Sequence, residues 1–255
     1  MLDRGVRKII ERVGIDSVFS GVKPLFQSCD AVVINLENPV TKRVSPLNKK
    51  YVFRAEPEWL PALRKHGITH AAMANNHTID QGREGIADTY RNLRKSNIIP
   101  IGYGNNQQGA CKPSLVEKNG VKVALFNSFL LRVEGWEFLE NEKGICQASA
   151  EQLSNSIKTF KKTNPNYWVV AILHWGEEYQ KEPSKRQRKE AYLLVDSGAD
   201  AIIGHHPHVI QDKEIYKGKP IFYSLGNFVF DQKESDRSSG LVVSLSFSIL
   251  PMCLE

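Results

Sequence analysis

Long apolar runs and paired cysteines are both missing from this sequence, and each absence limits the kind of protein it encodes. No stretch approaches the roughly 18 to 20 apolar residues of a membrane-spanning helix, and no basic and apolar leader follows Met1. The four cysteines form no CxxC pair. We therefore interpret them as small buried hydrophobic residues or idle thiols, and expect neither a disulfide framework nor a zinc knuckle.

An acidic excess is also missing, since the net charge is +6. Most lysines and arginines are interspersed with acids, apart from Lys42-Arg43, Lys49-Lys50 and the segment 181–189. That segment also contains Glu182, so a solvated helix face is the simpler interpretation and a patch for a polyanionic or phosphorylated substrate is the alternative. No nucleic-acid-binding motif is present, and we expect no nucleic-acid partner.

The sequence does contain five apolar runs that each end in Asn, Glu or His. The runs, which we predict to be strands, are residues 30–34, 69–74, 167–173, 199–203 and 220–223. The polar residues that follow them are Asn35 and Glu37, Asn75 to His77, His174, His205 to His208, and Asn227. Because ligands of open α/β sheets bind beyond the carboxyl ends of the strands, one shared site is the economical explanation.

The segment 69–85 shows this pattern most clearly, because an apolar run breaks into two amides, an imidazole and a carboxylate. A simpler interpretation is a helix start that is capped by Asn76, Thr78 or Asp80, with His77 as a solvated loop residue. The recurrence of the same design at four other strand ends favours a site.

The remaining patterns predict an alternation of strands and helices in one domain. Helices are expected at 1–13, 57–66, 85–96, 149–163 and 183–197, and further strands at 98–101, 112–116, 121–127, 209–215 and 241–250. Asn119-Gly120 predicts a hairpin turn. Residues 38–55 form a long polar loop that we expect to lie over the site, and residues 130–148 are expected to be a loop or excursion.

Five of the seven histidines lie at the predicted strand ends. Neutral imidazole binds Zn, Fe and Mn, and Glu37 and Asn76 offer oxygen ligands. With His174, His206 and His208 they could hold one or two divalent ions, and a pair about 4 Å apart could activate water. A lone histidine after a strand is more often an ordinary loop residue, but this clustering favours a metal or catalytic site.

The same residues, in this order, resemble the motifs of the CapA family of bacterial capsule (poly-γ-glutamate) synthesis proteins. The matching segments are 35–37, 74–85, 174–176, 204–211 and 223–228. That family is similar to the calcineurin-like metallophosphoesterases, so the resemblance implies an α/β fold with a two-sheet sandwich flanked by helices. It also implies that Asn76 is a metal ligand, that His77 assists the leaving group, and that His174, His206 and His208 are the metal histidines.

The family normally opens with a strand that ends in Gly-Asp, ahead of a segment similar to Met1-Leu2-Asp3-Arg4. We therefore expect one CapA-like domain over residues 1–255, truncated at both ends, that lacks the first strand and its aspartate. The resemblance also implies a location at the cell envelope, outside the cytoplasm, with the anchor missing from this sequence.

Three functions remain as alternatives. The first is a CapA-type protein of capsule biosynthesis that meets an anionic polymer and other capsule synthesis proteins at the membrane. The second is a metal-dependent phosphoesterase or amide hydrolase that acts on a small anionic substrate, with His77 as the acid. The third is a non-catalytic polymer-binding protein.

The expected cofactor is a divalent metal (Mn, Zn or Fe), as one or two ions. The residues expected to contact substrate are Asn35, Asn75, Asp80, His205 and Asn227.

Overall fold

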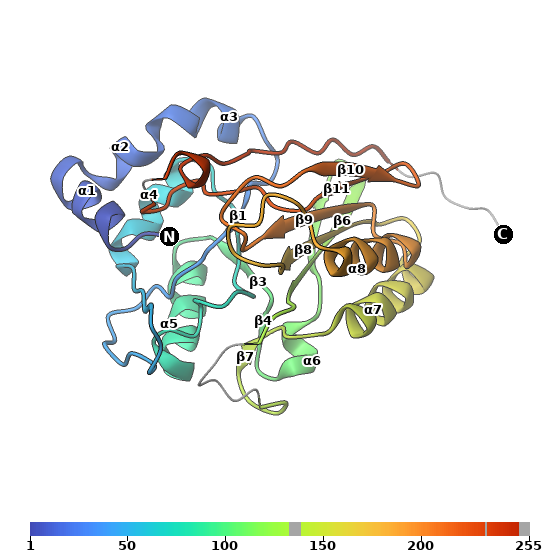
Figure 1. Ribbon diagram of the computed structural model, residues 1–255, viewed down its shortest axis with the longest axis horizontal. Helices are drawn as coiled ribbons and strands as arrows, with labels where there is room; N and C mark the ends of the chain where they lie inside the picture. Colours follow the sequence, from blue (N-terminus) through green and yellow to red (C-terminus); the bar gives the residue numbers. More distant parts are fainter. Residues whose placement is uncertain (133–138, 233, 250–255) are drawn as a thin grey trace. The chain divides into compact units, whose positions relative to one another are not determined.

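The computed structural model describes residues 1–132, 139–232 and 234–249, and the chain divides into two compact units. Unit 1 consists of Met1–Ala110, Arg132–Cys146 and Val229–Gln232, and unit 2 of Cys111–Leu131, Gln147–Phe228 and Lys233–Glu255. Each unit has its own sheet and helices (Figure 1). None of the helices in the described ranges has the length and apolar character needed to cross a bilayer.

Unit 1 is built on a parallel three-stranded sheet in the order β1-β2-β3. The strands are β1 (Val33–Asn35), β2 (His70–Ala72) and β3 (Ile99–Ile101), and Asn35 lies opposite Ala72 in the register. Because the strands are parallel, their carboxyl ends share one edge. The segments after β1 and β2, which carry Glu37 and the Asn-Asn-His run, therefore leave the sheet at the same edge.

The sequence predicted three of the helices of unit 1, at 1–13, 57–66 and 85–96. The helices of this unit are α1 (Gly5–Val13), α2 (Ile15–Phe19), α3 (Lys23–Gln27), α4 (Leu60–Lys65), α5 (Gly82–Lys95) and α6 (Gln107–Ala110), with single turns η1 (Ser20–Val22) and η2 (Pro57–Trp59). No element was predicted at α2, α3 or α6, because four or five residues are too few to display a helical period. Two short strands, β4 (Tyr103–Gly104) and β7 (Gly144–Ile145), pair antiparallel, and β7 lies in the stretch predicted to be a loop.

Unit 2 contains a six-stranded sheet in the order β10-β11-β9-β8-β6-β5 (Figure 1). The strands are β5 (Ser114–Lys118), β6 (Val121–Phe129), β8 (Trp168–His174), β9 (Ala201–His205), β10 (Lys213–Tyr216) and β11 (Lys219–Phe222). The four central strands are parallel, and the two edge strands are antiparallel to their neighbours. The register pairs His174 with His205, so the two strand ends that carry the histidines are adjacent.

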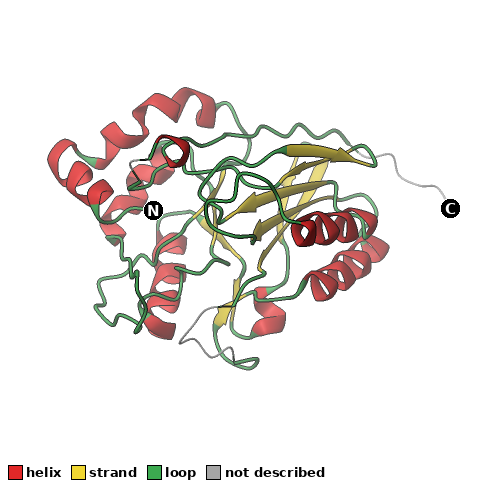
Figure 2. Cartoon of the chain, viewed as in Figure 1, coloured by secondary structure: helices red, strands yellow, loops and turns green. Residues whose placement is uncertain are grey.

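Two helices of unit 2 pack against each other, and the second also contacts β9 (Figure 2). They are α7 (Ala150–Thr163) and α8 (Lys185–Asp196). Each begins with a capping box, formed by Ser149 and Gln152 in α7 and by Ser184 and Gln187 in α8. Such caps satisfy backbone N–H groups that the helix itself leaves without partners, and each stabilises a helix by about 0.5–2 kcal/mol.

Both hairpins of unit 2 follow from their turn residues. Asn119 and Gly120 have φ of 51° and 79°, and Lys217 and Gly218 have φ of 48° and 76°. Two successive positive φ values match the right-handed twist of the flanking strands, which explains why an Asn-Gly pair predicts a hairpin. The predicted hairpin at Asn119-Gly120 is confirmed by the antiparallel pairing of β5 and β6.

The strand predicted at 241–250 is wrong for its described part, since residues 241–249 belong to no strand. The Leu241 N–H donates to the Leu225 carbonyl at 2.8 Å, but no ladder follows. Leu241, Val242 and Ile249 are all exposed. Alternating apolar residues produce a strand only where a neighbouring strand or core covers one face, and position 250 lies outside the described residues.

The prediction that no cysteine is in a disulfide is also wrong. Cys111 and Cys146 are both disulfide-bonded, whereas Cys29 is an exposed free thiol. Cys253 lies outside the described residues. Sequence spacing cannot reveal such a bond, because the fold decides which cysteines approach each other.

Replacing Cys146 by Ser should lower the stability of the protein, because a cross-link that restricts the unfolded chain is lost. We expect a decrease of about 2–4 kcal/mol in the free energy of unfolding. Cys29→Ser is the matched control and should change that free energy by less than about 0.5 kcal/mol. Denaturant unfolding of both variants without reductant measures the difference, and equal midpoints would contradict the structure.

Candidate functional site

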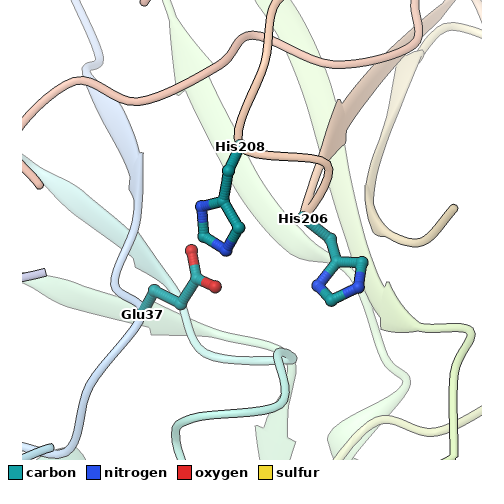
Figure 3. A group of neighbouring side chains, drawn as sticks. All are labelled: Glu37, His206 and His208. Carbon is teal, nitrogen blue, oxygen red and sulfur yellow. The ribbon is translucent and has the colours of Figure 1, made fainter. Parts of the chain in front are cut away.

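Three histidines of unit 2 lie together at the carboxyl edge of its sheet. His174 ends β8 and is 1% exposed, and its ring centroid lies 4.9 Å from that of His206. The His206 and His208 ring centroids are 6.0 Å apart, and ligand nitrogens of these two residues lie within 4.8 Å of each other (Figure 3). We call His174, His206 and His208 the histidine cluster. Neutral imidazoles grouped in this way are suited to bind a first-row divalent ion.

The loop after β9 holds the cluster in an unusual backbone conformation. His206 and His208 have φ of 102° and 60°, a region that costs a non-glycine residue about 1–3 kcal/mol. The Tyr179 N–H donates to the Pro207 carbonyl at 2.8 Å and helps to hold the loop. Strain of this kind is retained where the surrounding structure fixes it, and it is concentrated at functional sites.

The start of this loop also depends on a glycine in β9. A Cβ at position 204 would clash with the Tyr223 carbonyl oxygen and with the Trp175 indole nitrogen. In the structure that indole N–H donates to the same carbonyl at 2.9 Å. Gly204 therefore permits the close packing that places the end of β9 beside the end of β8.

Asn227 fixes the orientation of one cluster ring. The His208 Nδ1 and the Asn227 Oδ1 are 2.9 Å apart, and the Asn227 amide donates to the carbonyls of His208 and Arg237. An amide oxygen only accepts, so the His208 Nδ1 carries the proton and donates. The lone pair is then on Nε2, which is the form that binds a metal ion.

His205 differs from the cluster in its surroundings. It ends β9 beside its register partner His174, and burial lowers its pKa to about 4. The ring is therefore neutral near pH 7 and offers no positive charge to an anionic substrate. Its assignment as a substrate contact stays a prediction.

In unit 1, the loop after β1 holds a buried carboxylate. Glu37 is 6% exposed, and Asn35 Nδ2 donates to its Oε2 at 3.0 Å. Asn75, fully buried, donates from Nδ2 to the Leu36 carbonyl at 3.0 Å and to the Asn35 Oδ1 at 3.3 Å. These amides connect the ends of β1 and β2 and fix where the Glu37 carboxylate lies.

A second hydrogen-bonded chain in unit 1 orients His77. Its Nδ1 lies 2.8 Å from the Asp80 Oδ2, and its ring packs 4.4 Å from the Phe53 ring centroid. Asp80 is fully buried and also accepts hydrogen bonds from Lys49 Nζ at 2.7 Å and from the Phe53 N–H at 2.8 Å. A carboxylate oxygen accepts this hydrogen bond from the His77 Nδ1–H, so the His77 Nε2 is the ring nitrogen left for a substrate.

The long loop of residues 38–55 supplies two of these groups. Lys49 Nζ donates to the Asn76 carbonyl at 2.8 Å as well as to Asp80, and the Leu47 N–H donates to the Asp80 carbonyl at 3.0 Å. The sequence analysis did not identify Lys49 as a site residue. Its only signal was its place in the Lys49-Lys50 pair within a loop expected to lie over the site.

Two further residues beside the histidine cluster were also missed. Tyr179 lies with its ring centroid 6.2 Å from that of His208, and the Arg237 guanidinium lies 3.7 Å from the Tyr179 ring centroid. The non-glycine φ of 66° at Tyr179 has no signal in the sequence. Neither residue belongs to a predicted strand end.

Comparison with known proteins gives one family. The family model described as bacterial capsule synthesis protein PGA_cap matches residues 1–232. The PGA biosynthesis protein CapA of Bacillus subtilis is 39% identical over 91% of this chain and 61% of the relative. The capsule biosynthesis protein CapA of Bacillus anthracis is 38% identical over 91% of this chain and 58% of the relative. The chain thus spans about three-fifths of the length of these curated relatives.

Two solved structures share the fold at low sequence identity. The NAD nucleotidase of Haemophilus influenzae aligns with a TM-score of 0.55 and 11% identity, over 84% of this chain and 44% of that one. A phosphatase from Mycoplasma pneumoniae aligns with a TM-score of 0.51 and 14% identity, over 84% of this chain and 67% of that one. These likenesses confirm the predicted α/β fold of the metallophosphoesterase type.

The matched range 1–232 contains every motif on which the predicted resemblance was based, from Asn35 to Asn227. The resemblance is confirmed by the family model and by both CapA relatives. The chain belongs to the family of bacterial capsule synthesis proteins that this PGA_cap model describes.

Proposed function

We propose that this chain is the CapA-type part of a protein of capsule, or poly-γ-glutamate, biosynthesis, and that it binds a divalent metal at its strand ends. The family and the two CapA relatives support the first statement. The histidine cluster of unit 2 supports the second statement, because three imidazoles lie together there and two of them are on a strained loop.

The proposed metal ligands are His174, His206 and His208 of unit 2 and Glu37 and Asn76 of unit 1. Imidazole nitrogens with carboxylate and amide oxygens suit Mn, Zn or Fe, as one or two ions. Asn227 orients His208, and Asn35 orients Glu37. When bound, such an ion polarises a substrate oxygen and lowers the pKa of a water molecule.

His77 is the residue proposed to move a proton. Asp80 holds its Nδ1, and Lys49 beside Asp80 balances the charge of that carboxylate. When the ring is doubly protonated, its Nε2–H can donate that proton to a leaving group, and the ring returns to its neutral form with Nδ1 still held by Asp80. The second candidate function is therefore a hydrolase that acts on a phosphoester or an amide. The His77 arrangement favours it over a protein that only binds polymer.

We propose an extracytoplasmic location, with an anionic polymer and other capsule synthesis proteins as partners. The disulfide-bonded Cys111 and Cys146 support this location, because disulfides persist mainly in oxidising compartments. Asn35, Asn75, Asp80, His205 and Asn227 stay proposed as residues that contact or border the substrate.

Replacing both His206 and His208 by Ala should remove metal binding, because two nitrogen ligands are lost. Titration calorimetry with Mn²⁺ or Zn²⁺ and elemental analysis measure the loss, which we expect to exceed about a hundredfold in affinity. His205→Ala is the matched control and should keep the metal. Unfolding midpoints should change little, since these loop residues serve mainly function. Unchanged metal content in the double variant would rule out these ligands.

Glu37→Gln tests whether unit 1 supplies a ligand to the same ion. The substitution keeps the size of the side chain and removes its charge, so we expect the metal Kd to rise at least about tenfold. Combining it with His208→Ala gives a double-mutant cycle, in which shared coordination of one ion produces strongly non-additive effects. Additive effects on metal affinity would show that Glu37 acts elsewhere.

His77→Gln should lower turnover of any hydrolysed substrate by about 10²–10⁴-fold while leaving the metal content unchanged. A screen with p-nitrophenyl phosphate and with γ-linked polyglutamate identifies the substrate class. Asp80→Asn should also lower the turnover, because the His77 ring loses its carboxylate partner. Hydrolysis that continues at the original rate in His77→Gln would exclude His77 as the acid.

A further inference from the structure

An aromatic residue beside the histidine cluster is held in a strained conformation. Tyr179 has a φ of 66°, and its backbone N–H donates to the Pro207 carbonyl within the loop that carries His206 and His208. Its side chain is 37% exposed, although its ring lies only 6.2 Å from the His208 ring. Backbone strain of this kind is concentrated at functional sites.

A guanidinium is stacked on this ring. Arg237 Cζ lies 3.7 Å from the Tyr179 ring centroid, and the Arg237 carbonyl accepts a hydrogen bond from Asn227 Nδ2 at 2.8 Å. Asn227 also pairs with the His208 Nδ1. The Asn227 amide thus connects the backbone of Arg237 to the His208 ring. Tyr179, His208, Asn227 and Arg237 all belong to unit 2.

The Arg237 guanidinium has weak partners in the structure. Its nearest acids are Glu234 at 3.7 Å from Nη1 and Asp236 at 3.9 Å from Nε, both beyond hydrogen-bond distance. The buried Nε has no hydrogen-bond partner among the described residues. With its Nε buried and its Cζ close to the ring, the guanidinium can offer its two Nη groups, whose N–H donors match a carboxylate.

We propose that Arg237, stacked on Tyr179, forms a carboxylate-binding subsite beside the histidine cluster and holds one repeat unit of an anionic polymer. This inference rests on the proposed function, because it assumes that a polycarboxylate reaches the cluster. A chain with a carboxylate on every unit can place one unit at the cluster while a neighbouring carboxylate binds Arg237. The subsite thereby selects for polymer over isolated small anions.

The test measures binding of a γ-linked glutamate oligomer by titration calorimetry in the presence of Mn²⁺. Arg237→Gln should weaken binding roughly ten- to a hundredfold, because a charge-assisted hydrogen-bond pair is lost. Arg237→Lys should recover only part of the affinity, since an ammonium lacks the fork. Tyr179→Leu should also weaken binding, because the ring that supports the Arg237 guanidinium is lost.

Arg186→Gln is the matched control. Arg186 is exposed, lies in the same unit and pairs with Glu190 within α8, so its loss removes one positive charge without touching the cluster. Its affinity for the oligomer should stay within about twofold of the original, because screened surface charges act weakly. A second control ligand is the same oligomer with its free carboxylates converted to amides, for which Arg237→Gln should make no difference.

The outcomes separate this inference from the proposed function. Equal oligomer affinity in Arg237→Gln and the original protein would overturn the subsite and leave the proposed function standing. No oligomer binding by the original protein would overturn both. Loss of inorganic phosphate binding in Arg237→Gln with unchanged oligomer binding would overturn the carboxylate assignment in favour of a phosphate site. Metal content should be the same in all variants, which excludes an indirect effect through the cluster.

Discussion

The loop after β9 is held in a backbone conformation that most side chains avoid, and the proposed chemistry depends on it. His206 and His208 both have positive φ, and this backbone conformation sets the directions in which their imidazoles leave the loop. Three features keep the loop in place: the close packing permitted by Gly204, the hydrogen bond from Tyr179, and the amide of Asn227. The strain costs about 1–3 kcal/mol per residue, and it brings two ligand nitrogens within 4.8 Å of each other.

Unit 1 shows the same principle without strain, because amide side chains do the positioning. Asn35 and Asn75 hold Glu37 and the loop before His77, while Asp80 fixes the His77 ring. The functional groups of both units are therefore held by a second layer of hydrogen bonds, and not by their own backbone alone. Such layers restrict a ring or carboxylate to one direction, which is the condition for metal binding and for directed proton transfer.

The sequence predicted the strand ends well, because apolar runs and the donors that follow them are local patterns. His174 and the residues after β9 lie where the strand pattern places them. It could not predict the disulfide-bonded cysteines or the stacking of Arg237 on Tyr179, since both depend on contacts between residues distant in sequence. The alternating segment 241–249 failed for a related reason, because a strand also needs a hydrogen-bonded neighbour and the described residues form no ladder with this segment.

Crystals grown with Mn²⁺ and measured near the manganese absorption edge test the metal site most directly. The account predicts an anomalous peak about 2.0–2.3 Å from nitrogens of His206 and His208. A manganese peak at any other place, or a histidine cluster with no peak at saturating Mn²⁺, would contradict it.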